Sequence, residues 1–322
     1  MELPLRLRQA VDVALEGVAV SELAAATKAL SHRYRNEVRD GRLHISDAKL
    51  ALAYIATRMP ATYAAIHQSL SALAELKPGF APRTALDVGA GPGTVAWAAK
   101  ALWPELASMT LLEASPAIRA VGEKLVAPSA LEHVDWRNAD VTRDAGKLPA
   151  SDLVTLAYVL DELSVEQRNA LVDRLWALTD GVLVVVEPGT PAGWQRILDA
   201  RARLIAAGAN IVAPCPHAMA CPVVAPDWCH FSARVARSRV HRLAKEADVP
   251  WEDEKFIYLA ASREAAEVRP ARVLSPPESG SGRVKLKLCQ TDGALAYRLV
   301  TRREGDTFKA ARRVDWGDAF EG

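Results

Sequence analysis

Three of the four cysteines in this chain stand close together in a proline-rich stretch, and their thiols are its most distinctive chemical groups. These three are Cys215, Cys221 and Cys229, whereas Cys289 lies well downstream in a strand-like run. Thiolate is the preferred ligand for structural zinc and for iron–sulfur clusters. A chain that groups its cysteines in this way is expected to use all four as ligands of one metal centre.

The spacing between the cysteines bears on which metal they would hold. It reads C-x5-C and then C-x7-C, without the paired C-x2–4-C knuckles of most tetrahedral zinc sites. A proline directly follows each of the first two cysteines, as in the ligand loops of ferredoxins. The spacing therefore favours an iron–sulfur cluster over zinc, with no metal or a disulfide as the remaining alternatives. His217 and His230 are substitute ligands or neighbours of the site.

A glycine-rich turn far upstream is the second feature that could do chemistry. Gly89, Gly91 and Gly93 follow a short apolar run at 84–88 and precede a helical pattern. Glycines at a turn that opens onto a helix N-terminus let backbone N–H groups approach a polar cofactor. Glu113, at the end of the next expected strand, is placed to bind both hydroxyls of a ribose. We therefore expect a nucleotide-like cofactor at this turn.

The run 86–94 resembles the first motif of class I S-adenosylmethionine-dependent methyltransferases. The resemblance places Glu113 and Asp140 at the ribose and adenine positions. A dinucleotide-binding dehydrogenase is the alternative, but its turn usually reads G-x-G-x-x-G, which the spacing here breaks. A Rossmann domain that binds no nucleotide is the third interpretation. The expected cofactor-binding residues are Asp87, Gly89, Gly91, Gly93, Glu113 and Asp140.

Catalytic residues are not assigned by the sequence. The edge of the fourth strand, 156–163, lacks the Asn-Pro-Pro-Tyr of amino-group methyltransferases. If all four cysteines are ligands, none is left as the nucleophile of pyrimidine-C5 transfer. Methyl transfer can proceed largely by positioning, because the sulfonium is already activated. The sequence therefore neither proves nor excludes activity.

The elements that must position these two sites follow from the hydrophobic pattern. Apolar residues recur at helical spacing over about 4–76. From residue 82 onward, short apolar runs alternate with helices, which predicts a parallel sheet covered on both faces. The strands expected in it are 84–88, 109–113, 134–137, 151–156, 181–186 and 255–261. A basic helix is expected over 231–247, and a hairpin over 284–289 and 294–301 with its turn at 291–293.

The expected architecture is an α/β fold in four segments. They are a helical N-terminal cap (1–80), a Rossmann-like core that binds S-adenosylmethionine (81–204), a cysteine-rich insertion with the basic helix (205–254), and the last core strands with a small, basic C-terminal β extension, barrel-like or continuing the main sheet (255–322).

The distribution of charge points to RNA only locally. Forty Lys and Arg balance 39 Asp and Glu, so no global field indicates nucleic acid. Between residues 269 and 313, however, eleven bases face four acids. The expected basic helix would also suit RNA phosphates, and its cations are Arg234, Arg237, Arg239, His241, Arg242 and Lys245. Because the C-terminal segment has few aromatics, we expect contact with the RNA backbone rather than base stacking.

The chain shows no stretch suited to crossing a bilayer and no signal-peptide pattern at its start. We therefore expect a cytoplasmic monomer with no membrane partner.

Short motifs around the cysteines and near the C-terminus add a more specific resemblance. They are Cys-Pro-His at 215–217, Cys-Pro at 221–222, Trp-Cys-His-Phe at 228–231, Trp-Glu-Asp-Glu-Lys-Phe at 251–256 and Trp-Gly-Asp at 316–318. Together they resemble the mitochondrial small-ribosomal-subunit methyltransferase-like family and its bacterial relatives, from the N-terminal helices to the last strand.

This resemblance implies a class I methyltransferase fold, a [4Fe–4S] cluster, and association with small-subunit ribosomal RNA. Carried over residue by residue, the cluster ligands are Cys215, Cys221, Cys229 and Cys289. No catalytic residue carries over. An active rRNA methyltransferase, a catalytically silent assembly or translation factor, and a zinc-stapled methyltransferase therefore stay open. Radical chemistry is disfavoured because four cysteines can close the cluster.

Overall fold

A computed structural model describes residues 1–36, 43–138, 148–266 and 269–322 of the chain. Its centre is an eight-stranded sheet in the order β3–β2–β1–β4–β5–β8–β6, and β7 pairs with β8 outside this path. The strands are β1 (Thr84–Val88), β2 (Ser108–Leu112), β3 (His133–Arg137), β4 (Ser151–Ala157), β5 (Thr179–Pro188), β6 (Asn210–Ala213), β7 (Phe231–Ala236) and β8 (Trp251–Ser262).

Strands β1 to β5 are parallel, as the sequence predicts. Most apolar residues of β1, β2, β4 and β5 are buried, as is typical of parallel sheets, whereas the edge strand β3 is only partly covered. Strand β8 departs from this prediction, since it pairs antiparallel with both β5 and β6. The order reverses between β1 and β4, so the crevice at the carboxyl ends of these two strands is the topological switch point at which such sheets bind ligands. The glycine-rich turn leaves β1 at this crevice.

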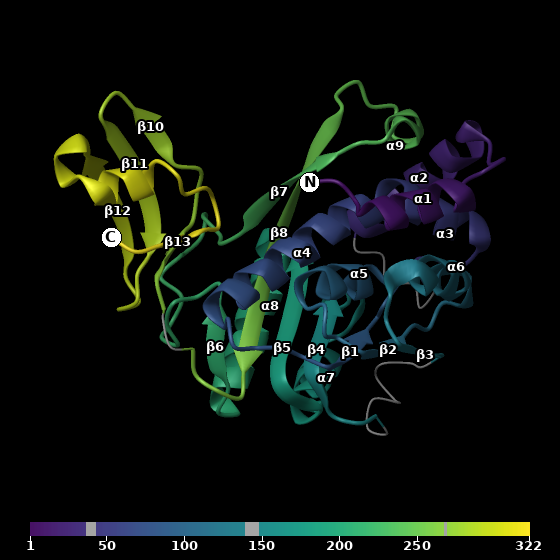
Figure 1. Ribbon diagram of the computed structural model, residues 1–322, viewed down its shortest axis with the longest axis horizontal. Coiled ribbons are helices and arrows are strands. Elements are labelled where there is room, and N and C mark those ends of the chain that lie inside the picture. The colour runs from purple at the N-terminus through teal and green to yellow at the C-terminus, as the bar shows by residue number, and fades with distance from the viewer. Residues whose placement is uncertain (37–42, 139–147, 267–268) are drawn as a thin grey trace.

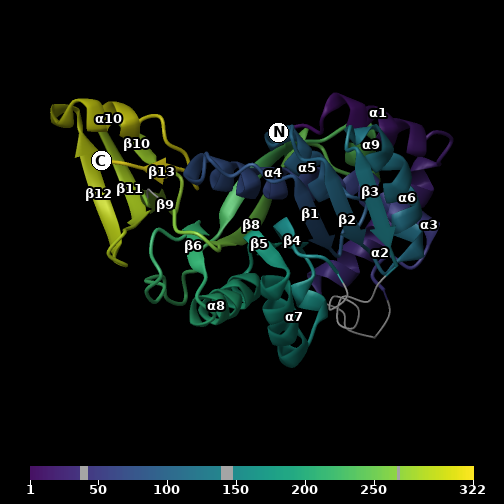
Figure 2. The same ribbon diagram turned by 60° about the horizontal axis from the view of Figure 1, so that its bottom comes forward.

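Helices cover both faces of the sheet, which confirms the expected layering. Figures 1 and 2 show α4 and α5 on one face and α7 and α8 on the other, with α1, α2 and α3 beyond the end of α4. The helices are α1 (Leu5–Ala14), α2 (Val20–Arg35), α3 (Ala48–Thr57), α4 (Met59–Leu76), α5 (Thr94–Leu102), α6 (Pro116–Val126), α7 (Val165–Ala177), α8 (Pro191–Ala206), α9 (Arg239–Ala244) and α10 (Asp306–Ala311). None of the described helices is both long enough and apolar enough to span a membrane.

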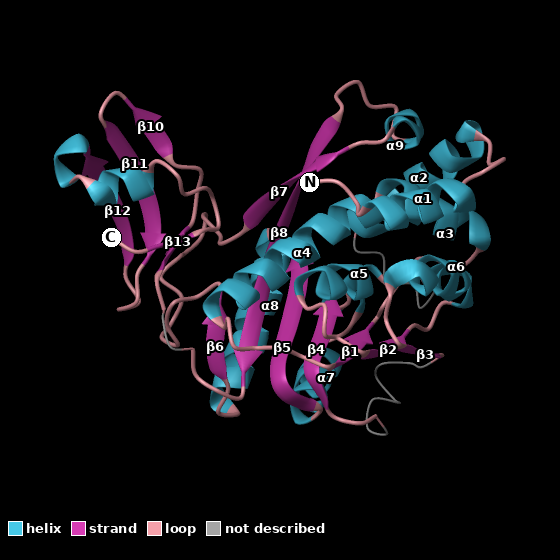
Figure 3. Ribbon diagram, in the orientation of Figure 1, coloured by secondary structure: helices cyan, strands magenta, loops and turns pink. Residues whose placement is uncertain are grey.

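The C-terminal residues form a second sheet, apart from the main one (Figures 1 and 3). Its order is β10–β11–β9–β13, and β12 pairs with β11. Its strands are β9 (Ala271–Val273), β10 (Glu278–Gly280), β11 (Arg283–Cys289), β12 (Leu295–Thr301) and β13 (Ala319–Phe320). This sheet has its own small core under α10, formed by Val284, Leu286, Val300 and Phe308 among others. The expected β11–β12 hairpin is confirmed, but the sheet neither closes as a barrel nor continues the main sheet.

Two elements of the segment expected as a cysteine-rich insertion differ from the sequence prediction. Strand β6 was not predicted, and the predicted helix over 231–247 is wrong: it is strand β7 followed by the short helix α9. Phe231, Ala233 and Val235 are buried at every second position, which is the period of a strand. The Cys215–Cys229 loop therefore runs between two strands of the main sheet. The division into four segments stays a prediction.

Candidate functional site

The glycine-rich turn lies where β1 ends and α5 begins. Gly89, Gly91 and Gly93 have φ values of +73°, +55° and +78°, a region that favours glycine. A Cβ on Gly89 would lie 2.4 Å from Val159 and one on Gly93 2.2 Å from Val126, whereas one on Gly91 would meet open space. Two glycines are thus needed for packing, and the third leaves the turn open to a ligand.

Glu113 follows β2 and holds the turn from the side. Its carboxylate accepts hydrogen bonds from the Gly91 N–H at 2.8 Å and from the Ser115 N–H at 2.7 Å. Burial raises the pKa of Glu113, and these two N–H groups act in the opposite direction. The expected ribose-binding carboxylate therefore does adjoin the turn, where it is already hydrogen bonded to the backbone.

Asp87, the last residue but one of β1, is almost fully buried behind the turn. Its Oδ1 accepts a hydrogen bond from Thr155 Oγ1 at 2.7 Å. Within the described part of the chain, Asp87 Oδ2 and the buried Thr94 Oγ1 have no hydrogen-bond partner. Burial raises the pKa of Asp87 to about 7. Two polar atoms at the turn thus lack a hydrogen-bond partner, and a polar cofactor bound there would supply one. Asp140 lies outside the described residues.

These groups line a cavity of about 30 Å³ at the turn. Its opposite wall comes from the N-terminal helices through Tyr54, Thr62 and Ile66, and from Tyr158 after β4. A site for a nucleoside-sized ligand needs about 300 Å³ or more. The space enclosed between these side chains is therefore smaller than such a ligand.

A polar network next to the cavity was not predicted from the sequence. Tyr158 has a left-handed φ of +59°, which is costly for a residue with a Cβ, and its hydroxyl donates to Glu254 in β8 at 3.2 Å. Arg58, between α3 and α4, lies 5.1 Å above the Tyr34 ring and attracts Glu254. The two contacts of Glu254, with Tyr158 and with Arg58, join parts of the chain about 100 and 200 residues apart, so no local sequence signal could have found them.

The four cysteines come from two separate parts of the fold. Cys215, Cys221 and Cys229 lie on the loop between β6 and β7, and Cys289 ends β11 in the C-terminal sheet. The loop reaches this strand directly, because His217 Nε2 lies 3.3 Å from Cys289 Sγ. Lys287, two residues earlier in β11, forms an ion pair with Asp227 of the same loop. The structure therefore brings the distant cysteine to the other three.

The thiols affect one another electrostatically. Burial raises the pKa of the Cys289 thiol to about 12, and the charges of Cys215 and Cys221 contribute. Burial also raises the pKa of Cys229 well above its usual value, with contributions from the other three cysteines. All four are free thiols. Over the described ranges, no three Cys, His, Asp or Glu side chains converge closely enough to hold a metal ion. The cysteines are thus neighbours without a finished coordination site.

Two buried arginines fix the cysteine loop. Arg201 in α8 donates through Nη2 to the backbone oxygens of His217 at 2.7 Å and Met219 at 2.8 Å. Arg272 in β9 donates to Pro214 O at 3.1 Å and to Gly317 O at 2.7 Å. Burial raises the pKa of the Cys215 thiol, and both guanidiniums act in the opposite direction without outweighing it. Buried cations cost free energy unless they have partners, and here both guanidiniums donate hydrogen bonds to backbone oxygens at the loop.

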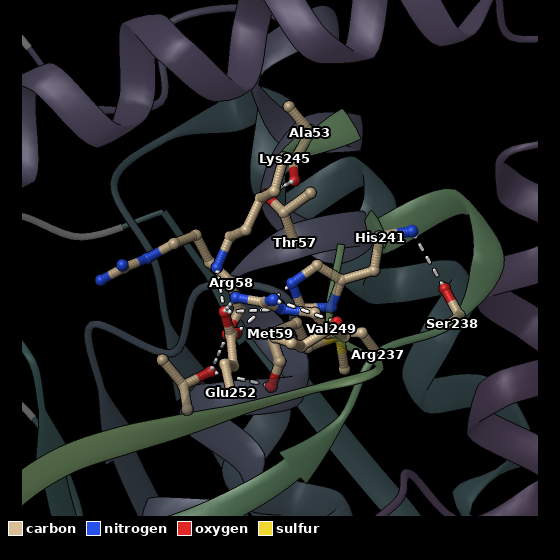
Figure 4. Close-up of polar contacts among 11 residues, drawn as sticks. Ala53, Thr57, Arg58, Met59, Arg237, Ser238, His241, Lys245, Val249 and Glu252 are labelled. Atoms are coloured by element: carbon tan, nitrogen blue, oxygen red, sulfur yellow. Dashed lines mark hydrogen bonds and ion pairs between the residues drawn. The ribbon is translucent and has the colours of Figure 1, made fainter. Parts of the chain in front are cut away.

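The cations expected on an RNA-facing helix lie differently from the prediction. Arg237, His241 and Lys245 turn inward and surround the Glu252 carboxylate (Figure 4), at 3.0, 3.3 and 2.6 Å. Arg234, in β7, pairs with Asp253 at 2.8 Å. Four of the six side chains therefore meet carboxylates of β8. This surface is not the run of unpaired bases that the sequence suggested.

Comparison with known proteins adds evidence that geometry alone does not give. Residues 48–321 match the family model described as mitochondrial small ribosomal subunit Rsm22. The chain is 31% identical over 290 residues to the human protein named ribosome assembly protein METTL17, mitochondrial, covering 84% of this chain and 62% of that protein. It is 25% identical over 324 residues to the Rsm22-cox11 tandem protein 2, mitochondrial, of Schizosaccharomyces pombe, covering 84% and 43%.

The chain thus spans about three fifths and two fifths of the length of these two relatives. Among solved structures, it is similar to an O-methyltransferase family protein from Burkholderia thailandensis. That match has a TM-score of 0.47 and 14% sequence identity, and it covers 77% of this chain and 72% of that one.

Proposed function

The chain belongs to the mitochondrial small ribosomal subunit Rsm22 family, and on that premise we propose that it binds small-subunit ribosomal RNA as a ribosome assembly factor. The match over residues 48–321 carries this proposal, because it includes the cofactor turn, the cysteine loop and the C-terminal sheet. The name of the human relative, a ribosome assembly protein, agrees with it. Both named relatives are mitochondrial, so the cytoplasmic location expected for this chain stays a prediction. The expected monomeric state also stays a prediction.

The cofactor in this proposal is S-adenosylmethionine, a donor of an activated methyl group. Gly91 would offer its open side to the ligand, and Glu113 would exchange its bond to the Gly91 N–H for the ribose hydroxyls. The unpaired oxygens of Asp87 and Thr94 support a polar ligand at this place. Isothermal titration with S-adenosylmethionine and S-adenosylhomocysteine tests this part. A chain that binds neither compound would contradict it.

The four cysteines are proposed to hold a [4Fe–4S] cluster. Their grouping from two segments and the buried Arg201 and Arg272 beside them support a centre with several thiolates. Zinc is the alternative for the same residues. Anaerobic purification with iron, sulfide and zinc analysis separates the two. We expect a broad absorbance near roughly 400 nm and about four irons per chain; one zinc in a colourless protein would overturn the cluster.

Methyl transfer to the RNA is the second candidate function. It is favoured by Tyr158, whose strained backbone places its hydroxyl against Glu254 beside the cofactor cavity. An amine that receives a methyl group must lose a proton, and here the Tyr158 oxygen would accept it while the Tyr158 hydroxyl proton passes to the Glu254 carboxylate. The test is transfer of a labelled methyl group from S-adenosylmethionine to small-subunit RNA. If the chain binds the RNA without transferring a methyl group, the assembly function stands and methyl transfer is wrong.

A further inference from the structure

One face of the β11–β12 hairpin is left open to solvent, and its side chains are unusual for such a position. The register pairs Lys285 with Leu299 and Arg283 with Thr301, so these residues share one face of the two strands. The alternate residues, such as Val284 and Val300, face α10 and are buried. We call Arg283, Lys285, Tyr297 and Leu299 the outer face of the hairpin.

The outer face carries two large apolar side chains in a row. Tyr297 is 63% exposed and Leu299 is 55% exposed, at successive outward positions of β12. In the described part of the chain, β12 pairs with β11 alone and is therefore an edge strand. Single exposed apolar residues are common on protein surfaces. Here two adjacent ones stand on an open edge beside cations, which gives a ligand both an apolar and a charged group to contact.

The charge of the outer face favours an anionic partner. Lys285 Nζ lies 5.9 Å from the centre of the Tyr297 ring, and Arg283 is exposed at the start of β11. Lys285 also contacts Glu278 at 3.3 Å, but this pair is exposed and can be given up at little cost. The cation and the ring thus stand together, as in surfaces that hold a phosphate and an unpaired base at once.

A comparison with the basic residues around α9 also favours the outer face as the surface that contacts an anionic partner. The basic residues around α9 are largely paired with Glu252 and Asp253, so they are poorly suited to hold RNA phosphates. Among the described residues, the cysteine loop contacts β11 next to the outer face, at Cys289 and Lys287. Arg283 and Leu299, at the far end of the outer face, are exposed.

From these contacts we propose that the outer face of the β11–β12 hairpin binds a single-stranded RNA segment. A base stacks on the Tyr297 ring, Leu299 packs beside it, and Arg283 and Lys285 hold the neighbouring phosphates. The segment is single-stranded because the bases of a duplex are already stacked on one another and offer no free face to the ring. This inference rests on the proposed RNA-binding function and names the surface that performs it, with stacking where the sequence suggested only backbone contact.

The test uses the full chain and a fluorescently labelled single-stranded RNA of about ten nucleotides and mixed sequence. Tyr297→Ala should weaken binding, measured by fluorescence anisotropy, by roughly five- to 150-fold, the range of one lost base stack. Tyr297→Phe is the matched control and should bind like the original chain, because it keeps the ring. The side chain is exposed, so neither variant should disturb folding, which circular dichroism checks.

The phosphate contacts are tested separately, by the salt dependence of RNA binding. Each phosphate contact on a single strand contributes about 0.7 to the slope of log K against log salt. The double variant Arg283→Ala, Lys285→Ala should therefore reduce this slope by about 1.4. A slope that does not change would overturn the assignment of these two residues.

Binding of small-subunit RNA by the original chain separates this inference from the proposed function. If that RNA binds and Tyr297→Ala binds it equally well, the outer face is not the RNA site, although the proposed function stands. If Tyr297→Ala instead loses a small-subunit protein and keeps RNA, the face binds protein and the inference is wrong. If the original chain binds neither RNA, both proposals fail. Binding of the short RNA alone, dependent on Tyr297, would support the inference without the function.

Discussion

The Lys245 ammonium lies 2.6 Å from the Glu252 carboxylate and ties the end of α9 to the start of β8. Arg237 and His241 approach the same carboxylate (Figure 4). Burial raises the pKa of Glu252, but the contact with His241 and the Lys245 charge outweigh it and hold the pKa well below its usual range. A single carboxylate, whose side chain is only 13% exposed, thus balances Lys245 and Arg237.

Replacing this carboxylate should be strongly destabilising. Glu252→Gln leaves Lys245 and Arg237 without their partner, so we expect a loss of about 3–5 kcal/mol in the free energy of unfolding. Urea denaturation followed by circular dichroism measures it. Asp253→Asn is the matched control in the same strand, because its pair with Arg234 is 43% and 66% exposed and should contribute less than about 1 kcal/mol. Equal losses in the two variants would contradict the central role of Glu252.

The same carboxylate should make stability depend on pH in acid. The pKa of Glu252 is lower in the folded chain than its value of about 4.3 in an unfolded one. The stabilisation is therefore fully present above about pH 4.3 and is lost as the pH falls through the folded pKa. The difference in unfolding free energy between the original chain and Glu252→Gln should shrink steadily below pH 4.3. A difference that stays constant down to pH 3 would show that the pKa of Glu252 is not lowered.

The glycine turn shows where prediction from the sequence succeeds, and the run 231–247 beside Glu252 shows where it fails. The glycine turn was predicted because its signal is local: a strand, three glycines and a helix follow one another within 84–102. The run 231–247 was misread because its bases recur as on a helix, while its buried residues alternate as in a strand. The inward turn of Arg237 depends on Glu252 in another strand. The contact of Tyr158 with Glu254 spans even more of the chain, and such pairings have no local signature.

The glycines of the turn should respond differently to a methyl group. Gly93→Ala adds a Cβ at 2.2 Å from Val126, so we expect a loss of about 1–3 kcal/mol from overpacking, in addition to backbone strain. Gly91→Ala meets open space and should lose only about 1–2 kcal/mol for its left-handed backbone. Cofactor binding should follow the opposite order, with Gly91→Ala the more damaging when measured by isothermal titration. A Gly91→Ala chain that binds S-adenosylmethionine normally would argue against the open side of the turn as the ligand side.

Cys289 should be needed both for the metal and for the attachment of the C-terminal sheet. Cys289→Ser removes the only proposed ligand outside the loop between β6 and β7, so metal content and melting temperature should both fall. Lys285→Ser is the control, since it puts the same residue on an exposed position of the same strand. Iron and zinc analysis and a thermal melt, both under anaerobic conditions, give the two readings. Unchanged metal content and an unchanged melting temperature in Cys289→Ser would contradict the proposed four-cysteine centre.

The charge of Asp87 should lower the stability of the fold and strengthen the binding of S-adenosylmethionine. Its pKa of about 7 in the folded chain lies above the value of about 3.9 in an unfolded chain. The folded state is therefore favoured by protonation of Asp87 at low pH, and this advantage is lost as the pH rises from 3.9 to 7. Above pH 7 the charge opposes folding because it is buried away from water, and one of its oxygens has no hydrogen-bond partner in the described part of the chain.

Asp87→Asn should consequently be more stable than the original chain at pH 8, by on the order of 1 kcal/mol. It should also bind S-adenosylmethionine at least roughly tenfold more weakly, as one hydrogen bond to a charged group is lost. Asp152→Asn is the contrasting control at the start of β4. That carboxylate accepts from the Arg83 and Thr84 N–H groups at 2.9 Å, so its loss should destabilise the fold and leave binding unchanged. An Asp87→Asn chain that loses stability and keeps its affinity would make Asp87 a structural residue.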